Sequence, residues 1–106
     1  MPRAHPDSLQ NENVYVDVLD GTCKLDQNAV SKHWVGIIGG IIYHDRNLSA
    51  GSQLDKISDT LKKEFDIITS NVPPQDLEIS IKVTIIAKQG KTLVKHIQTF
   101  SFPDTP

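Results

Sequence analysis

The feature that most restricts the fold is a run of alternating apolar and polar residues near the C-terminus. Its apolar positions are Leu77, Ile79, Ile81, Val83, Ile85 and Ala87. Between them stand Glu78, Ser80, Lys82 and Thr84. Because successive side chains of a β-strand point to opposite faces, this pattern predicts a strand with one buried and one exposed face. A chain with such a strand has to build a sheet and cover one face of it.

A turn and a returning strand follow this run. Lys88-Gln89-Gly90-Lys91 places a glycine where a positive φ is needed, and residues 92–102 form the second arm of a hairpin. A two-residue loop at Gln89-Gly90 gives these pairs on the apolar face: Leu77 with Phe102, Ile79 with Phe100, Ile81 with Gln98, Val83 with His96 and Ile85 with Val94. A loop one residue longer would bury Lys95, Thr99 and Ser101 and expose both phenylalanines, so the two-residue loop is favoured.

One segment has the periodicity of a helix. From Ser52 to Ile68 the apolar residues recur at steps of three or four and form a single stripe. They are Leu54, Ile57, Leu61, Phe65 and Ile68. Ser52 and Asp55 resemble a capping box at its start, and Pro73 and Pro74 follow its end. We expect one main helix at about residues 52–68.

The N-terminal half carries a shorter alternation. Val14, Val16 and Val18 point one way, and Asp20-Gly21 after them is a strong two-residue hairpin signal. Pairing across this turn places Val18 opposite Cys23, Asp17 opposite Lys24 and Val16 opposite Leu25. The sequence therefore predicts a hairpin here, with Cys23 as a small buried residue.

The run from His33 to His44 has two interpretations. It is nearly all apolar and contains the pair Gly39-Gly40. The pair is either the turn of a tight hairpin or a bulge within one long strand that is apolar on both faces. We favour the single strand, because both arms of a hairpin would have to be fully buried. The polar segment before it, from Asp26 to Lys32, fits a short helix capped by Asp26.

These elements predict an α+β domain. Its antiparallel sheet has four or five strands, with the helix at residues 52–68 packed on one face and a long C-terminal hairpin. Residues 13–102 form this single domain. Flexible tails are expected at residues 1–12 and 103–106, where polar residues and prolines dominate.

Composition removes several classes of function. The 106 residues carry 11 basic and 13 acidic side chains, a net charge of -2, which argues against nucleic acid and anionic lipid as partners. The longest apolar stretch, Trp34 to Tyr43, is about half of the roughly 20 residues that span a membrane. The N-terminus has no apolar region typical of a secretion signal, so we expect a cytoplasmic protein. With one cysteine and no ligand spacing around His33, His44 and Asp45, we expect neither a metal nor a cofactor.

The long hairpin carries a second apolar patch on its other face, where Lys82 and Lys95 border three apolar residues. Each arm of about 11 residues is ~37 Å long, whereas a helix of about 17 residues covers only ~25 Å. We therefore predict a partner-binding surface formed by Ile86, Leu93, Lys95 and Ile97. Such a surface suits a small non-enzymatic protein-binding module of inhibitor, immunity or adaptor type that acts through a face or an edge of its sheet. Its partner is another protein or a second copy of the chain, and we favour self-association as a homodimer.

An alternative function rests on His96 and Gln98. These two side chains lie two residues apart on the helix-facing side of one strand. In a pocket between sheet and helix, histidine would accept a proton and glutamine would orient a ligand carbonyl, as in a small ligand-binding, lyase or isomerase fold. Asp17 or Tyr43 is a further candidate for the lining of this cavity.

Overall fold

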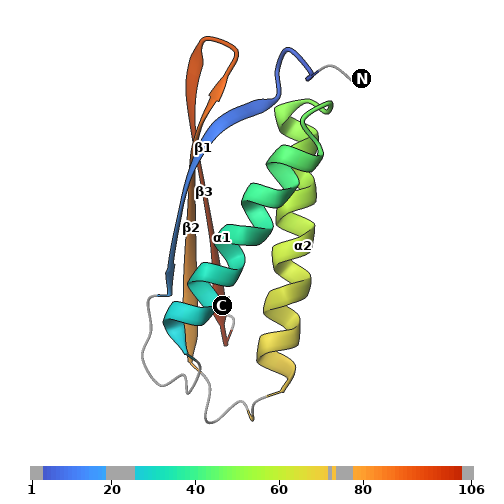
Figure 1. Cartoon of the computed structure of the whole chain (residues 1–106). Coiled ribbons are helices and arrows are strands. Elements are labelled where there is room, and N and C mark those ends of the chain that lie inside the picture. The colour runs from blue at the N-terminus through green and yellow to red at the C-terminus, as the bar shows by residue number, and fades with distance from the viewer. Residues whose placement is uncertain (1–3, 19–25, 72, 74–77, 104–106) are drawn as a thin grey trace.

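A three-stranded antiparallel sheet and a pair of helices on one of its faces form the two layers of the computed structural model (Figure 1). The structure describes residues 4–18, 26–71, 73 and 78–103. The elements follow in the order β1 (Leu9–Val18), α1 (Gln27–His44), α2 (Ala50–Ser70), β2 (Ile79–Gln89) and β3 (Thr92–Phe102). In the sheet β2 lies between β1 and β3.

The predicted α+β class with an antiparallel sheet is confirmed, but the predicted numbers of strands and helices are not. The expected four or five strands and single main helix are wrong for the described part of the chain, which has three strands and two helices. One part of the difference is the segment at residues 33–44, which is helical. Another is the expected strand at residues 23–25, which lies outside the described residues.

Helix α1 contains the run that was expected to be a strand. It begins at Asp26, whose carboxylate accepts the Ala29 N–H at 3.1 Å, so the predicted cap is confirmed although the helix continues to His44. Trp34, Ile38 and Ile42 recur every four residues and are buried. The exposed positions between them include Gly36 and Gly40. Since these surface positions carry glycine instead of a charged residue, the sequence shows none of the polar contrast that normally reveals a helical period.

Helix α2 is the predicted main helix with extended ends. Its N-terminal cap is Ser49, whose hydroxyl accepts the Ser52 N–H at 3.4 Å. The expectation that Ser52 caps the helix is therefore wrong. The predicted stripe faces inward, with Ile57, Leu61 and Phe65 buried.

A bulge in β1 places odd-numbered residues before it and even-numbered residues after it on the same face of the sheet. The register with β2 shifts by one residue between Gln10 and Asn13, where Asn11 has a φ of 52°. An inserted residue reverses the alternation, so Leu9 before the bulge and Val16 after it are both buried. Residues 9–12, expected in a flexible tail, therefore belong to the sheet. The predicted hairpin through Asp20-Gly21 and Cys23 lies outside the described residues, and β1 pairs with β2.

The C-terminal hairpin has the predicted faces with a register shifted by two residues. Ile79 pairs with Phe102, and the two-residue loop is Gly90-Lys91, not Gln89-Gly90. Gly90 has a φ of 63° at the first loop position, where a turn of type II′ takes glycine. A shift of two residues leaves every side chain on its face, so the assignment of faces survives the wrong loop.

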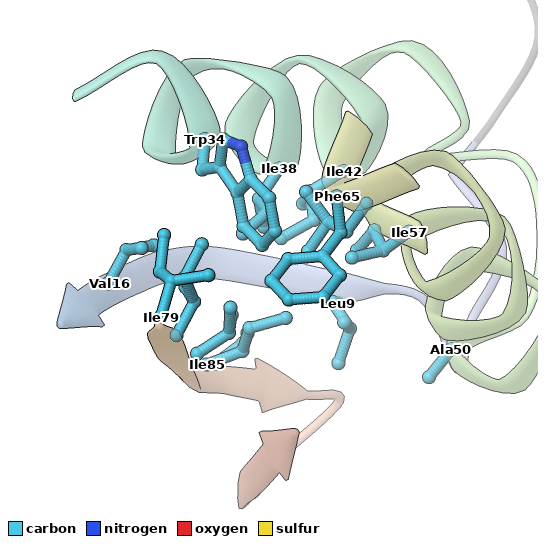
Figure 2. Packing of buried hydrophobic residues seen from close by; sticks show 14 residues of the cluster. Leu9, Val16, Trp34, Ile38, Ile42, Ala50, Ile57, Phe65, Ile79 and Ile85 are labelled. Carbon is cyan, nitrogen blue, oxygen red and sulfur yellow. The ribbon is translucent and has the colours of Figure 1, made fainter. Parts of the chain in front are cut away.

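The core lies between the sheet and both helices (Figure 2). Trp34 packs edge-on against Phe100, with ring centroids 5.6 Å apart, and Phe65 packs against Phe100 at the same distance. Two helices thus cover the sheet where one was expected. This removes the argument that the length of the hairpin leaves its helix-facing side open.

Candidate functional site

The face of the sheet that points away from the helices, here called the outer face, carries the predicted binding residues. Ile86 comes from β2, and Leu93, Lys95 and Ile97 come from β3. Both helices lie on the opposite face (Figure 1). Leu93 is 69% exposed and Ile97 is 48% exposed. The structure therefore brings these four residues together on one exposed surface.

Tyr15 extends the outer face onto β1, and sequence reasoning did not assign it there. It lies opposite Thr84, which in turn lies opposite Ile97, so the three form one row across the sheet. Tyr15 is 54% exposed. Its alternation with Val14 and Val16 indicated an exposed face. What the sequence left open was the partner strand, because β1 was expected to pair with residues 23–25.

Lysines surround the apolar centre of the outer face. Lys82 lies between Asp17 and Thr99, Lys95 lies opposite Ile86, and Lys88 lies opposite Leu93 and Gln10. None of the ion pairs in residues 4–18, 26–71, 73 and 78–103 involves these three lysines. The surface thus combines exposed apolar side chains with an excess of positive charge, although the whole chain has a net charge of -2.

His96 and Gln98 lie on the other face of β3, as predicted. Gln98 pairs with Val83, and its Oε1 accepts a hydrogen bond of 2.7 Å from the Ser58 hydroxyl of α2. His96 lies opposite Ile85 and is half-buried. The contact with Ser58 gives Gln98 a structural role in joining α2 to the sheet.

A cleft of about 380 Å³ opens between the C-terminal halves of α2 and β3. Its lining combines aromatic, hydroxyl and charged side chains: Lys62, Phe65, Asp66, Thr69, Thr99, Phe100, Ser101 and Phe102. His96 and Gln98 do not line it. The cleft lies beside β3, at the edge of the sheet.

The remaining histidines occupy separate places. His33 Nε2 lies 3.6 Å from a carboxylate oxygen of Glu64, and His44 Nδ1 lies 3.0 Å from Asp45 Oδ1. Among the described residues no group of three or more His, Cys, Asp or Glu side chains is close enough to hold a metal ion. Cys23 lies outside these residues. None of the described helices is both long and apolar enough to cross a membrane.

Gln53 and Asp45 are among the buried polar side chains that sequence reasoning missed. Gln53 is fully buried and joins β1 to α1: its Oε1 accepts the Leu9 N–H at 2.7 Å, and its Nε2 donates to the Ile42 carbonyl at 3.1 Å. Asp45 is buried between the helices, with its Oδ2 at 2.9 Å from Lys56 Nζ. Lys56, and after it His44, hold the pKa of Asp45 below its usual value. Both groups stabilise the junction of the two helices.

Comparison of the chain with protein-family models, curated proteins and solved structures found no match. The function is therefore inferred from the chemistry of the surface itself.

Proposed function

We propose that the protein is a non-enzymatic protein-binding module, of inhibitor, immunity or adaptor type, that acts through the outer face of its sheet. The observation that supports this most is the group of exposed apolar side chains on one face of a sheet whose other face is filled by two helices. Tyr15, Leu93 and Ile97 are each about half exposed or more. Exposed apolar groups of this kind, framed by charged residues, are typical of interaction sites.

The charge of the outer face favours a partner with carboxylates around an apolar centre. Among the paired residues of the outer face, Lys82, Lys88 and Lys95 stand against Asp17. Two copies packed through this face would bring six lysines together, and like charges in an interface cost affinity. An acidic partner surface would pair with Lys88 and Lys95 and cover Ile86 and Leu93 between them.

A peptide-display selection against the immobilised protein tests this proposal. We expect the selected peptides to combine Asp or Glu with aromatic or aliphatic residues. Their addition should shift the amide resonances of Tyr15, Ile86 and Leu93 in NMR spectra of the labelled protein. Peptides without acidic enrichment, or shifts confined to the helices, would contradict the proposal.

Two variants on β1 and β2 sharpen the test. Lys88→Glu and Tyr15→Ser should each weaken binding of the selected peptides by about tenfold, because one reverses a rim charge and the other removes an apolar contact. Lys63→Glu on α2 makes the same charge change on an exposed lysine elsewhere and should leave binding unchanged. If Lys63→Glu weakens peptide binding equally, the effect of Lys88→Glu comes from the net charge of the protein and not from its place on the outer face. Tight binding of a mixed-sequence single-stranded RNA to the same face would replace the proposal by a nucleic-acid function.

A further inference from the structure

The two edges of the sheet differ in their protection against pairing with another strand. β1 is interrupted by the bulge at Asn11, which bends a strand and disturbs its edge. β3 keeps an unbroken register with β2 along all 11 of its residues and contains no proline and one lysine, Lys95. Bulges, prolines and charges are the usual means of blocking an edge. Among the described residues, therefore, none of these features blocks the edge of β3, and it can take a further strand.

The backbone groups at this edge follow from the turn. Thr92 faces Gln89 across the two-residue loop, where a β-turn directs its N–H to the Gln89 carbonyl. Alternate residues of an antiparallel strand direct their backbone groups to opposite sides. Leu93, Lys95, Ile97, Thr99 and Ser101 therefore turn theirs away from β2. Within the described residues, no backbone hydrogen bond outside the β2–β3 ladder involves residues 93–102.

We propose that two copies of the chain join through this edge, with β3 antiparallel to β3 of the second copy about a two-fold axis at Ile97. The free backbone groups of the two strands then pair with each other. On the outer face Ile97 meets Ile97, Lys95 meets Thr99, and Leu93 meets Ser101 of the second copy. On the helix face Val94 meets Phe100, and His96 meets Gln98. Neither face sets two lysines opposite each other, so the strand is complementary to itself in this register.

The cleft between α2 and β3 supports this register. Phe100 lines the cleft, and Val94 of the second copy would lie directly opposite Phe100 on the same face. The valine side chain would then cover the apolar rings of Phe65 and Phe100 from the open side. Moving the axis to His96 or Gln98 would pair that polar residue with its own copy and separate Val94 from Phe100.

Amide hydrogen exchange at two protein concentrations tests the edge directly. At about 1 μM the amides of Ile97 and Thr99 should exchange rapidly, because they lack a partner in the monomer. At about 1 mM they should exchange at least roughly tenfold more slowly, while the amides of Gln98 and Phe100, which belong to the ladder, stay protected at both concentrations. Light scattering should give twice the 11.8 kDa monomer mass at the higher concentration. A monomer throughout this range, or a dimer whose Ile97 and Thr99 amides remain unprotected, would overturn the proposal.

A pair of variants at one position isolates the backbone contribution. Thr99→Pro removes an N–H that points away from β2, a position at which an edge strand tolerates proline. It should weaken the dimer by about a hundredfold, because two symmetry-related hydrogen bonds are lost. Thr99→Val retains the N–H and should dimerise like the unchanged protein. Equal dimerisation of both variants would refute pairing through β3, and if Thr99→Pro does not fold, the exchange of the unchanged protein still decides the question.

Discussion

Gln53 is the single side chain whose replacement we expect to destabilise the fold most for its size. It is fully buried and joins three elements, because it accepts the Leu9 N–H at the start of β1 and donates to the Ile42 carbonyl near the end of α1. The Ile42 carbonyl is one of the last four of its helix, which have no partner within the helix itself. Replacing Gln53 with leucine preserves approximate volume and removes both hydrogen bonds at once.

The expected cost follows from the two groups left behind. Each buried backbone group that loses its partner costs about 1–3 kcal/mol, and the added apolar surface of leucine offsets part of the sum. We expect Gln53→Leu to lower the free energy of unfolding by about 3 kcal/mol. For a domain of this size that corresponds to a fall in Tm of roughly 10–20 °C.

Urea denaturation of matched variants measures this cost. Gln27→Leu makes the same change at an exposed position of α1 and should alter stability by less than about 0.5 kcal/mol. Gln53→Glu should be less stable at pH 7 than at pH 5, because one carboxylate oxygen would face the Ile42 carbonyl until it is protonated. Such a group has a raised pKa in the folded state, and stability then falls as pH rises. A loss for Gln53→Leu no larger than that for Gln27→Leu would refute the reasoning.

Three further predictions concern the helices. Gly36→Ala and Gly40→Ala should each raise the free energy of unfolding by up to about 1 kcal/mol in urea denaturation. The reason is that a Cβ at either position meets nothing within 4 Å and alanine favours a helix. A lower free energy of unfolding would show that another surface approaches this face. Asp45 has a lowered pKa in the folded state, so its contribution is present above the unfolded pKa of about 3.9 and is lost as pH falls below it. Acid titration of stability should therefore be shallower for Lys56→Met, which removes the main cause of the shift, and an unchanged profile would exclude this ion pair. Ser58→Ala and Gln98→Ala should each lower the free energy of unfolding by about 1 kcal/mol. The double variant should lose little more than either single variant, because both substitutions remove the same hydrogen bond. Additive losses would show that Gln98 does not act through Ser58 and would leave it available for a binding role.

The parts of the fold that were predictable are those in which polar and apolar residues contrast. The stripe Ile57, Leu61 and Phe65 defined α2, and alternation defined the faces of β2 and β3. The loop was misplaced because Gly90 belongs to either two-residue loop and its positive φ fits both, whereas the pairing of Gln89 with Thr92 shows which one forms. Helix α1 could not be predicted from a contrast between polar and apolar residues. Its isoleucines and glycines alternate in blocks, and no charged residue among them marks the exposed side.

The candidate site divides in the same way. The outer face was correctly assigned for Ile86, Leu93 and Ile97. Side chains of a strand alternate between faces, so an error of two residues in register leaves each one on its face. Gln53 was missed because a polar residue in a helix normally marks the exposed face. Its spacing of four residues from Ile57 nevertheless continues the buried stripe, which is the signal that would have identified it.

The two proposed contacts use different parts of the sheet and reinforce each other. Pairing through β3 would place the outer faces of two copies side by side, with Ile97 at the axis and Leu93 on either side of it. A partner with two acidic segments would then bind two such faces at once, and the second contact would form at a high effective concentration. Thr99→Pro should therefore weaken a two-segment partner far more than a single segment, whereas Lys88→Glu should weaken both. Binding of the two-segment partner that is unaffected by Thr99→Pro would separate the two contacts and leave the outer face to act alone.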